Sequence, residues 1–341
     1  MAKRSNAKVT THDVAKRAGV SQPTVSLVLS RNPKARIAEG TRARVIQAAT
    51  ELGYRPNLLA RGLVRRKSFS LGLIVPDLRD PFFADVASGA ERVASDEGYA
   101  LLLCDRRGNG SMRHIEALRG RQIDGLIIDA AAAASLPAGA LDGLDVVLID
   151  QPDGPFPGIA SDAEAAGHLA AEHLLALGHT RFAFMGPAAD VHTFRMRERG
   201  FVKALRAAGM ALGTSHLRRG PATVAGGMAA MRALLALSAA ERPTAVFCAN
   251  DLMALGAHKQ CATQHVQIPA DLSLVGCDDI EMARLVTPEL TTISVPAREI
   301  GARAARLLVD PRQAAGADTP KSRMLPVKLV VRGSTAANRA H

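Results

Sequence analysis

Beyond residue 67 the chain repeats one pattern, in which a short apolar run is followed by an alanine-rich stretch of helical length. Apolar runs of this kind are typical of strands buried on both faces, and parallel strands need helical crossovers between them. The pattern therefore predicts an α/β fold of parallel sheets flanked by helices, a fold class that hosts many functions. The apolar runs are residues 71–75, 101–104, 125–128, 146–149, 182–185, 245–248 and 274–276.

Positive charge is concentrated in front of this region. Residues 1–67 contain 15 of the 43 Lys and Arg residues but only 3 of the 32 Asp and Glu residues, so they carry a formal charge of +12 and the rest of the chain −1. A field so localised attracts a polyanion, and the nearly neutral remainder argues against a chain that is merely basic for solubility. The segment therefore predicts nucleic acid as a partner.

Length and composition are typical of a cytoplasmic globular protein. The chain has 341 residues, of which 48% are hydrophobic and 22% charged, enough for two or three domains. The N-terminus is basic, but Lys8 and Asp13 interrupt any signal peptide, and no apolar run that could span a membrane follows. The cysteines form no CxxC pair, so we expect neither a disulfide nor a cysteine metal site. They are Cys104, Cys248, Cys261 and Cys277.

Three short amphipathic helices fit the basic segment, because its apolar residues recur at helical spacing. Thr10 or Thr11 can cap the first helix, and Gly19 permits a tight bend after it. Ser21 can cap the second helix, with Pro23 in its first turn. The pattern predicts a helix-turn-helix, with a small solvated helical lobe as the alternative. The apolar sets are Val14, Ala15 and Ala18, then Val25, Val28 and Leu29, then Val45, Ile46, Ala49 and Leu52.

Two stretches of this segment carry specific motifs, THDVAKRAGVSQPTVS at residues 11–26 and ELGYRPNLLARGL at residues 51–63. They resemble the headpiece of the LacI/GalR family of bacterial transcription regulators. The resemblance implies that the second helix enters the major groove, while hydroxyls near the helix starts contact phosphates. The implied base contacts are Gln22, Pro23 and Leu27, and the implied phosphate contacts are Thr10, Ser21, Thr24, Ser26 and Tyr54.

Leu27 departs from the family pattern, in which this position is usually an arginine. An arginine can make a bidentate contact with guanine, whereas a leucine offers only apolar contact, for example with a thymine methyl group. Pro23 also lacks polar side-chain atoms. We therefore expect an operator half-site that is unusual for the family; the alternative is that Leu27 packs against the first helix.

Residues 57–66 resemble the family's hinge helix, which is short and forms on DNA. The resemblance implies that Leu63 enters the minor groove beside its copy from a second subunit, and Asn57 and Ala60 belong to the same motif. Such a wedge depends on two copies acting together on a bendable step. The sequence thus predicts a homodimer on a pseudo-palindromic operator in double-stranded DNA; a plain interdomain linker is the alternative.

Motifs of common enzyme classes are absent from the α/β region. The first apolar run leads into PDLRDP at residues 76–81, which has no glycine for a GxGxxG dinucleotide site. Neither a P-loop nor a GxSxG elbow occurs, and the ten histidines form no HExxH pattern. We therefore expect no catalytic activity, no metal and no cofactor.

Further motifs extend the resemblance over essentially the whole chain, among them QIDGLI, RMRERGF, GCDD and VVRGST. They resemble the family's two-lobed, periplasmic-binding-protein-like (type I) core, whose α/β lobes are joined by three crossing strands. The implied domains are a helix-turn-helix headpiece at 1–56, a hinge helix and linker at 57–68, a core at 69–337 and a tail at 338–341. Lobe 1 takes about 69–161 and 294–321, and lobe 2 about 162–293 and 322–337.

Ligands of open α/β sheets bind beyond the carboxyl ends of the strands, where several matching positions lie. Arg197, Asn250 and Asp278 are the leading effector-binding candidates. A guanidinium fork, an amide and a carboxylate together can satisfy adjacent hydroxyls of a sugar or the edge of a nucleobase. The alternative for Arg197 and Asp278 is a mutual or local ion pair.

Three softer candidates complete the predicted effector site. Asp150 can add a carboxylate from the first lobe, and Phe82 or Phe83 can supply an apolar face for a ring. For Asp150 the alternative is a turn cap, and for Phe83 it is ordinary core.

The sequence therefore predicts a DNA-binding transcription regulator, in the first instance a repressor, whose operator affinity is switched by a small molecule between the lobes. A sugar or sugar derivative is the first candidate. Inducer and co-repressor logic both stay open, as does a protein co-regulator. The alternative is a binding protein or enzyme built on the α/β core, with an incidental basic N-terminus.

Overall fold

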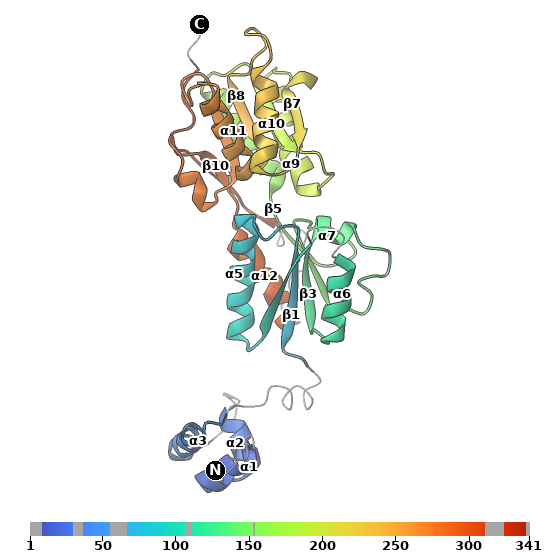
Figure 1. The fold of residues 1–341 in the computed structure, drawn as a ribbon, viewed down its shortest axis with the longest axis vertical. Coiled ribbons are helices and arrows are strands. Elements are labelled where there is room, and N and C mark those ends of the chain that lie inside the picture. The colour runs from blue at the N-terminus through green and yellow to red at the C-terminus, as the bar shows by residue number, and fades with distance from the viewer. Residues whose placement is uncertain are drawn as a thin grey trace, which may run out of the picture. The chain divides into compact units, whose positions relative to one another are not determined.

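The protein is described from a computed structural model that covers residues 9–29, 37–54, 67–106, 111–152, 154–310 and 324–338. It divides into two compact units, Met1–Ser68 and Phe69–His341. Figure 1 shows the small helical unit and the larger α/β unit. No helix among the described residues is long and apolar enough to cross a membrane.

The small unit is a three-helix headpiece built of α1 (Thr11–Ala18), α2 (Gln22–Leu29) and α3 (Glu39–Glu51). Thr10 and Asp13 form a capping box at the start of α1, and Gly19 ends that helix in the left-handed region at φ 65°. The Ser21 hydroxyl accepts the Thr24 amide at 3.4 Å. The helices pack on a shared apolar core of Val14, Ala15, Ala18, Val25, Val28, Val45, Ala48 and Ala49.

One expected core residue of the headpiece lies outside. Ile46 is 50% exposed, whereas Ala48 is buried. Residues three and four apart share a helix face, so Val45, Ala48 and Ala49 form the inner stripe of α3 and Ile46 points away.

The first lobe of the larger unit has a six-stranded sheet in the order β11-β5-β4-β3-β1-β2. All neighbouring strands in it are parallel. Its strands are β1 (Ser70–Val75), β2 (Ala100–Asp105), β3 (Gly125–Asp129), β4 (Val146–Ile149), β5 (Gly158–Ser161) and β11 (Met324–Leu325). Its helices are α5 (Pro81–Asp96), α6 (Ser111–Gly120), α7 (Ala130–Ala134) and α12 (Ala297–Val309).

The second lobe has a six-stranded sheet in the order β12-β10-β9-β8-β6-β7. Its strands are parallel except for the edge strand β12, which is antiparallel to β10. The strands are β6 (Phe182–Pro187), β7 (Leu217–Gly220), β8 (Ala245–Cys248), β9 (Ser273–Asp278), β10 (Thr291–Ser294) and β12 (Lys328–Val330). The helices are α8 (Ala163–Ala176), α9 (His192–Ala207), α10 (Val224–Leu235) and α11 (Asp251–Thr263).

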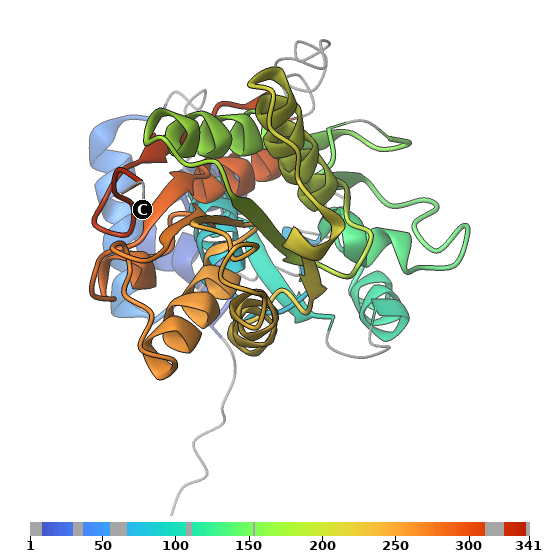
Figure 2. The same cartoon turned by 90° about the horizontal axis from the view of Figure 1, so that it is seen from above.

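Helices cover both faces of each sheet, as Figures 1 and 2 show. Successive strand residues point to opposite faces, so each strand feeds two apolar layers. In β1, Leu71 and Leu73 join the cluster beneath α5 and α12, while Ile74 joins the cluster beneath α6. Parallel strands buried on both faces explain the continuous apolar runs of the sequence.

The chain passes between the lobes three times, after β5, after β10 and after β11. The third passage differs from the boundary expected after residue 321. Met324 and Leu325 pair with Ala160 and Ser161 of the first sheet. A strand of two residues has no apolar periodicity from which its lobe can be predicted.

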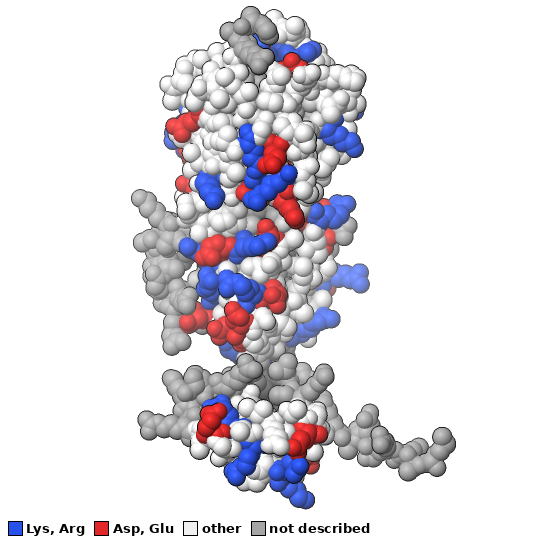
Figure 3. Space-filling model, turned by 90° about the vertical axis from the view of Figure 1, so that its left-hand side faces the viewer, with Lys and Arg blue, Asp and Glu red and all other residues white. Residues whose placement is uncertain are grey.

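On the face drawn in Figure 3, basic and acidic side chains are interspersed over the larger unit. This agrees with the nearly neutral charge of residues 68–341. The four cysteines are unpaired thiols. Burial raises the pKa of the Cys248 and Cys277 thiols well above the ordinary value, so they pack as small apolar side chains.

Candidate functional sites

A cleft of about 560 Å³ lies between the two lobes of the larger unit. The ends of β1, β3 and β4 and the start of α5 border it on the first lobe, and α9, the start of α11 and the end of β9 on the second. The carboxyl ends of parallel strands thus face the cavity from both sides. The structure brings all the predicted effector-binding residues to this one cleft: Phe82, Phe83, Asp150, Arg197, Asn250 and Asp278.

Arg197 occupies the second-lobe wall and is only 2% exposed. One guanidinium nitrogen donates to the Asp278 carboxylate at 2.9 Å and another to the Ala249 carbonyl oxygen at 2.5 Å. The guanidinium also lies 5.5 Å from the centre of the Phe194 ring. Its Nε is buried and has no partner among the described residues. The ion pair between Arg197 and Asp278, which was the alternative to a role in effector binding, is therefore present. Both residues nevertheless line the cleft.

Asp278, the ion-pair partner of Arg197, is the last residue of β9. Burial raises the pKa of its carboxyl group well above the ordinary value, and the neighbouring Arg197 opposes that shift. Its backbone has a φ of 123°. A strained backbone of this kind persists where the surrounding structure holds it, and it aims the side chain here at Arg197.

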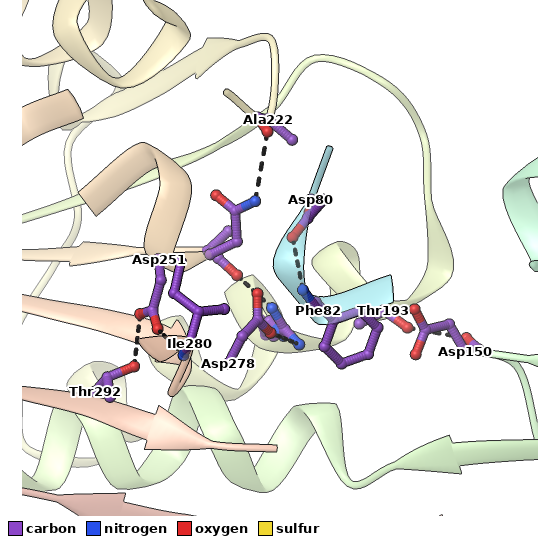
Figure 4. A network of polar contacts seen from close by, with 12 residues as sticks. Asp80, Phe82, Asp150, Thr193, Ala222, Asp251, Asp278, Ile280 and Thr292 are labelled. Atoms are coloured by element: carbon purple, nitrogen blue, oxygen red, sulfur yellow. Dashed lines mark hydrogen bonds and ion pairs between the residues drawn. The ribbon is translucent and has the colours of Figure 1, made fainter. Parts of the chain in front are cut away.

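Asn250 caps α11 and also reaches the second-lobe wall. Its side-chain oxygen accepts the Met253 amide at 3.0 Å, and its side-chain nitrogen donates to the Ala222 carbonyl at 3.5 Å. The second bond appears at the top of Figure 4. The amide thus has a structural role in the helix cap and leaves one N–H for a ligand.

Asp150 follows β4 on the first-lobe wall, with a φ of 65°. Its carbonyl oxygen accepts the Thr193 hydroxyl of the second lobe at 2.9 Å, so the residue links the lobes through its backbone. One oxygen of its side chain, Oδ1, is buried and has no hydrogen-bond partner among the described residues. Figure 4 shows Asp150 beside Thr193.

Phe82 and Phe83 lie at the start of α5, where Asp80 caps the helix by accepting the Phe82 amide at 3.0 Å. The two rings meet edge to face, with centroids 5.1 Å apart. Both are largely buried in the core cluster of the first lobe and also border the cleft. Phe83 is therefore both a core residue, as in the alternative, and a residue at the edge of the cleft.

Sequence reasoning missed several polar residues of the cleft, notably Asp129, Arg106, Asp80 and Thr193. Asp129 could have been predicted from its position at the end of β3. Asp150 has the equivalent position after β4, the neighbouring strand. Arg106 follows β2 in the same way. The same position rule, applied to every predicted strand, points to both.

Helix α2 of the headpiece has one exposed and one buried face. Val25 and Val28 are buried, whereas Leu27 is 42% exposed. Leu27 is thus not a member of the buried headpiece core. Four of the predicted base-facing and phosphate-facing positions share this exposed side: Gln22, Pro23, Ser26 and Leu27.

The remaining predicted DNA contacts surround α2. Thr10 and Ser21 are exposed at the starts of α1 and α2, and Thr24 is half-buried with its hydroxyl 2.9 Å from that of Ser21. Tyr54 is half-buried against the headpiece core. The predicted hinge residues Asn57, Ala60 and Leu63 lie outside the described residues.

Comparison with known proteins gives matches at both ends of the chain. A family described as bacterial regulatory proteins, lacI family, matches residues 10–57, and a periplasmic binding protein-like domain matches residues 171–335. The HTH-type transcriptional repressor CytR of Escherichia coli (strain K12) is 35% identical over 98% of this chain and 99% of its own.

Solved structures agree with these matches. The lac repressor dimer bound to operator and the anti-inducer ONPF is 29% identical with a TM-score of 0.79, over 97% of this chain and 100% of that chain. A LacI family transcriptional regulator from Enterococcus faecium, with bound ribose, is 28% identical with a TM-score of 0.70, over 79% of this chain and 100% of that chain. The chain therefore belongs to the lacI family of bacterial regulatory proteins and is a DNA-binding transcription regulator.

Proposed function

We propose that this protein is a dimeric repressor whose affinity for a pseudo-palindromic operator changes when a small molecule binds in the interlobe cleft. The observation that carries the proposal is the convergence of polar groups from both lobes on one cavity. Three of its lining atoms, Nε of Arg197, Nε of Arg106 and Oδ1 of Asp150, are buried without a partner among the described residues. Buried polar atoms are normally satisfied, so a ligand is the natural partner for these atoms.

The headpiece supplies the DNA-binding half of the proposal. The exposed side of α2 enters the major groove, where Gln22 offers hydrogen bonds and Leu27 an apolar contact to base edges. The hydroxyls of Thr10, Ser21, Thr24, Ser26 and Tyr54 are proposed phosphate contacts. Residues 57–68 are the proposed hinge, with Leu63 as its wedge and Asn57 and Ala60 in the same motif.

The cleft supplies the switch. A ligand that bridges the lobes changes their relative arrangement only through its different affinity for the two arrangements. Thr193 and Asp150 already join the lobes at the cleft wall, so a ligand held by Asp150 and Arg197 acts on that joint. A sugar or sugar derivative is the first candidate effector, supported by the ribose in the Enterococcus faecium regulator.

The proposal also covers catalysis and location in the cell. The relatives act as repressors, so we assign the protein no catalytic role of its own. A chromosomal operator also places its work in the bacterial cytoplasm. The competing function, an enzyme or binding protein with an incidental basic N-terminus, has no separate structural observation in its favour.

The test uses the full-length protein and DNA fragments from around its own gene, with and without a panel of sugars, sugar phosphates, nucleosides and nucleobases. We expect specific retention of a pseudo-palindromic fragment that one compound alters. Removing residues 1–67 should abolish retention and leave ligand binding intact. Absence of any specific retention would contradict the proposed function.

A further inference from the structure

The first-lobe wall of the cleft is rich in carboxyl groups. Among the described residues, five aspartates and three arginines line the cavity: Asp77, Asp80, Asp129, Asp150, Asp278, Arg79, Arg106 and Arg197. Arg79 is held by Asp77 through contacts of 2.6–3.1 Å, and Arg197 is held by Asp278. This leaves three carboxyl groups, those of Asp80, Asp129 and Asp150, that form no ion pair among the described residues; Arg197 acts on Asp80 and Asp150, and Arg106 on Asp129, only through their charge.

Asp129 and Asp150 form the centre of this excess. Their strands are neighbours in the sheet, and Asp129 is paired in register with Ile149, the residue before Asp150. Both side chains are buried, at 2% and 8% exposure. Asp129 accepts the Ala132 amide at 3.1 Å, whereas Oδ1 of Asp150 has no partner among the described residues.

The surroundings do not neutralise this pair. Burial raises the pKa of both carboxyl groups; the charge of Asp150 raises the pKa of Asp129 further, and that of Asp80 raises the pKa of Asp150. Arg106 lowers the pKa of Asp129, and Arg197 that of Asp150, without cancelling the rise. Neighbouring carboxyl groups that cannot both ionise easily are stabilised in their ionised form by a cation placed beside them.

We infer that the effector presents an amino group, and not an acidic group, to Asp129 and Asp150. This inference rests on the proposed function and defines the chemistry of its effector. One amino group can donate to Oδ1 of Asp150 and to Asp129 together, and a protonated amine also offsets their charge. A phosphate or carboxylate placed there meets the repulsion of three carboxyl groups. Amino sugars and amino-substituted nucleosides share the required chemistry.

The experiment measures binding to the full-length protein by calorimetry for pairs of compounds of which one carries an amino group and the other does not. The sugar arm compares glucosamine with glucose and galactosamine with galactose. The nucleoside arm compares cytidine with uridine and adenosine with inosine. Glucose 6-phosphate and glucuronate test acidic ligands. Each compound is also tested for its effect on operator retention.

We expect one amino compound to bind about ten- to a hundredfold more tightly than its matched partner, the range for a charge-assisted hydrogen bond. Asp129→Asn and Asp150→Asn should each remove that preference. The asparagine at 129 can still accept the Ala132 amide, so α7 keeps its cap. The control is Asp162→Asn, since Asp162 caps α8 through the Ala165 amide in the same way but lies outside the cleft.

The inference is overturned if no amino compound binds, if a neutral partner or an acidic compound binds as tightly, or if the preference survives both cleft variants. The ligand-free protein provides a separate readout. Absence of operator retention both without ligand and with every compound contradicts the proposed function, whereas specific retention with no amino preference contradicts this inference alone.

Discussion

Arg197 and Asp278 form a buried ion pair, and removing either residue alone is expected to lower the stability of the folded protein. Replacing Arg197 by alanine leaves the Asp278 carboxylate buried without its partner. We therefore expect Arg197→Ala to lower the free energy of unfolding by about 3–5 kcal/mol, measured by urea denaturation. The control is Arg197→Met combined with Asp278→Asn, which should lose less because no charge remains unpaired. Equal losses would show that the Ala249 and Phe194 contacts dominate instead.

Leu27 gives a residue-scale prediction for DNA recognition. Because its exposed side chain has no hydrogen-bond donor, the wild-type protein should not select guanine through this position. Leu27→Arg should add a preference for guanine of about 1–3 kcal/mol at one half-site position, measured by binding-site selection from random DNA. Identical half-sites selected by both proteins would contradict the placement of Leu27 at the base edges.

Asp150 gives a prediction for the dependence of stability on pH. Burial raises the pKa of its carboxyl group, so the folded protein keeps this proton to a higher pH than the unfolded chain does. This contribution to stability is fully present below the ordinary pKa and is lost as pH rises through the raised one. The raised pKa is about 6, so Asp150→Asn should gain stability relative to wild type as the pH rises from about 4 to about 7, measured by urea denaturation. A constant difference across that range would contradict the raised pKa.

Residue chemistry at strand ends made much of the cleft predictable. Asn250 and Asp278 were identifiable because they follow apolar runs, and Arg197 because it belongs to a family motif. Thr193 was not, since its role depends on a hydrogen bond to a backbone carbonyl of the other lobe. Pairings of that kind depend on tertiary geometry, which no local pattern in the sequence records.

At the scale of elements, paired glycines hold α8 against α9. A Cβ at Gly200 would lie 1.9 Å from the Glu164 carbonyl oxygen, and one at Gly167 would lie 1.8 Å from that of Arg197. The close approach of the two helices therefore positions the helix that carries Arg197 and Thr193.

Gly200→Ala should force these helices apart. We expect a loss of about 1–3 kcal/mol in the free energy of unfolding, together with weaker ligand binding. The control is Gly120→Ala at the end of α6, where an added Cβ meets nothing within 4 Å. A Gly200→Ala protein with unchanged stability and ligand affinity would contradict the role of this helix contact.

The apolar runs predicted β1, β2, β3, β4, β6, β8 and β9, and the structure confirms each of them within a few residues. The strands without a clear signal are short or lie at the sheet edges. β7, for example, reads Leu-Arg-Arg-Gly, and β11 has only two residues. Such strands form because the backbone of a neighbouring strand is available for hydrogen bonding. Their own sequence therefore gives little indication that they are strands.

The whole molecule combines two functions that the chain keeps in separate units. The headpiece has the exposed recognition helix, and the core has the cleft with its unsatisfied polar atoms. Charge segregation and the family motifs predicted this division from the sequence. The chemistry of the effector was not predictable in the same way, because it depends on a few side chains that only the folded chain brings together in the cleft.

Ligand and operator bind the same protein and influence one another through it, so their effects on each other's affinity must be reciprocal. If a ligand changes operator affinity by some factor, the operator must change ligand affinity by the same factor. The measurement is the dissociation constant of the amino ligand for the full-length protein, free and saturated with its operator. We predict a ratio of about 5- to 150-fold, equal to the shift in operator affinity. A ratio of one, with both partners bound, would contradict the claim that the cleft controls DNA binding.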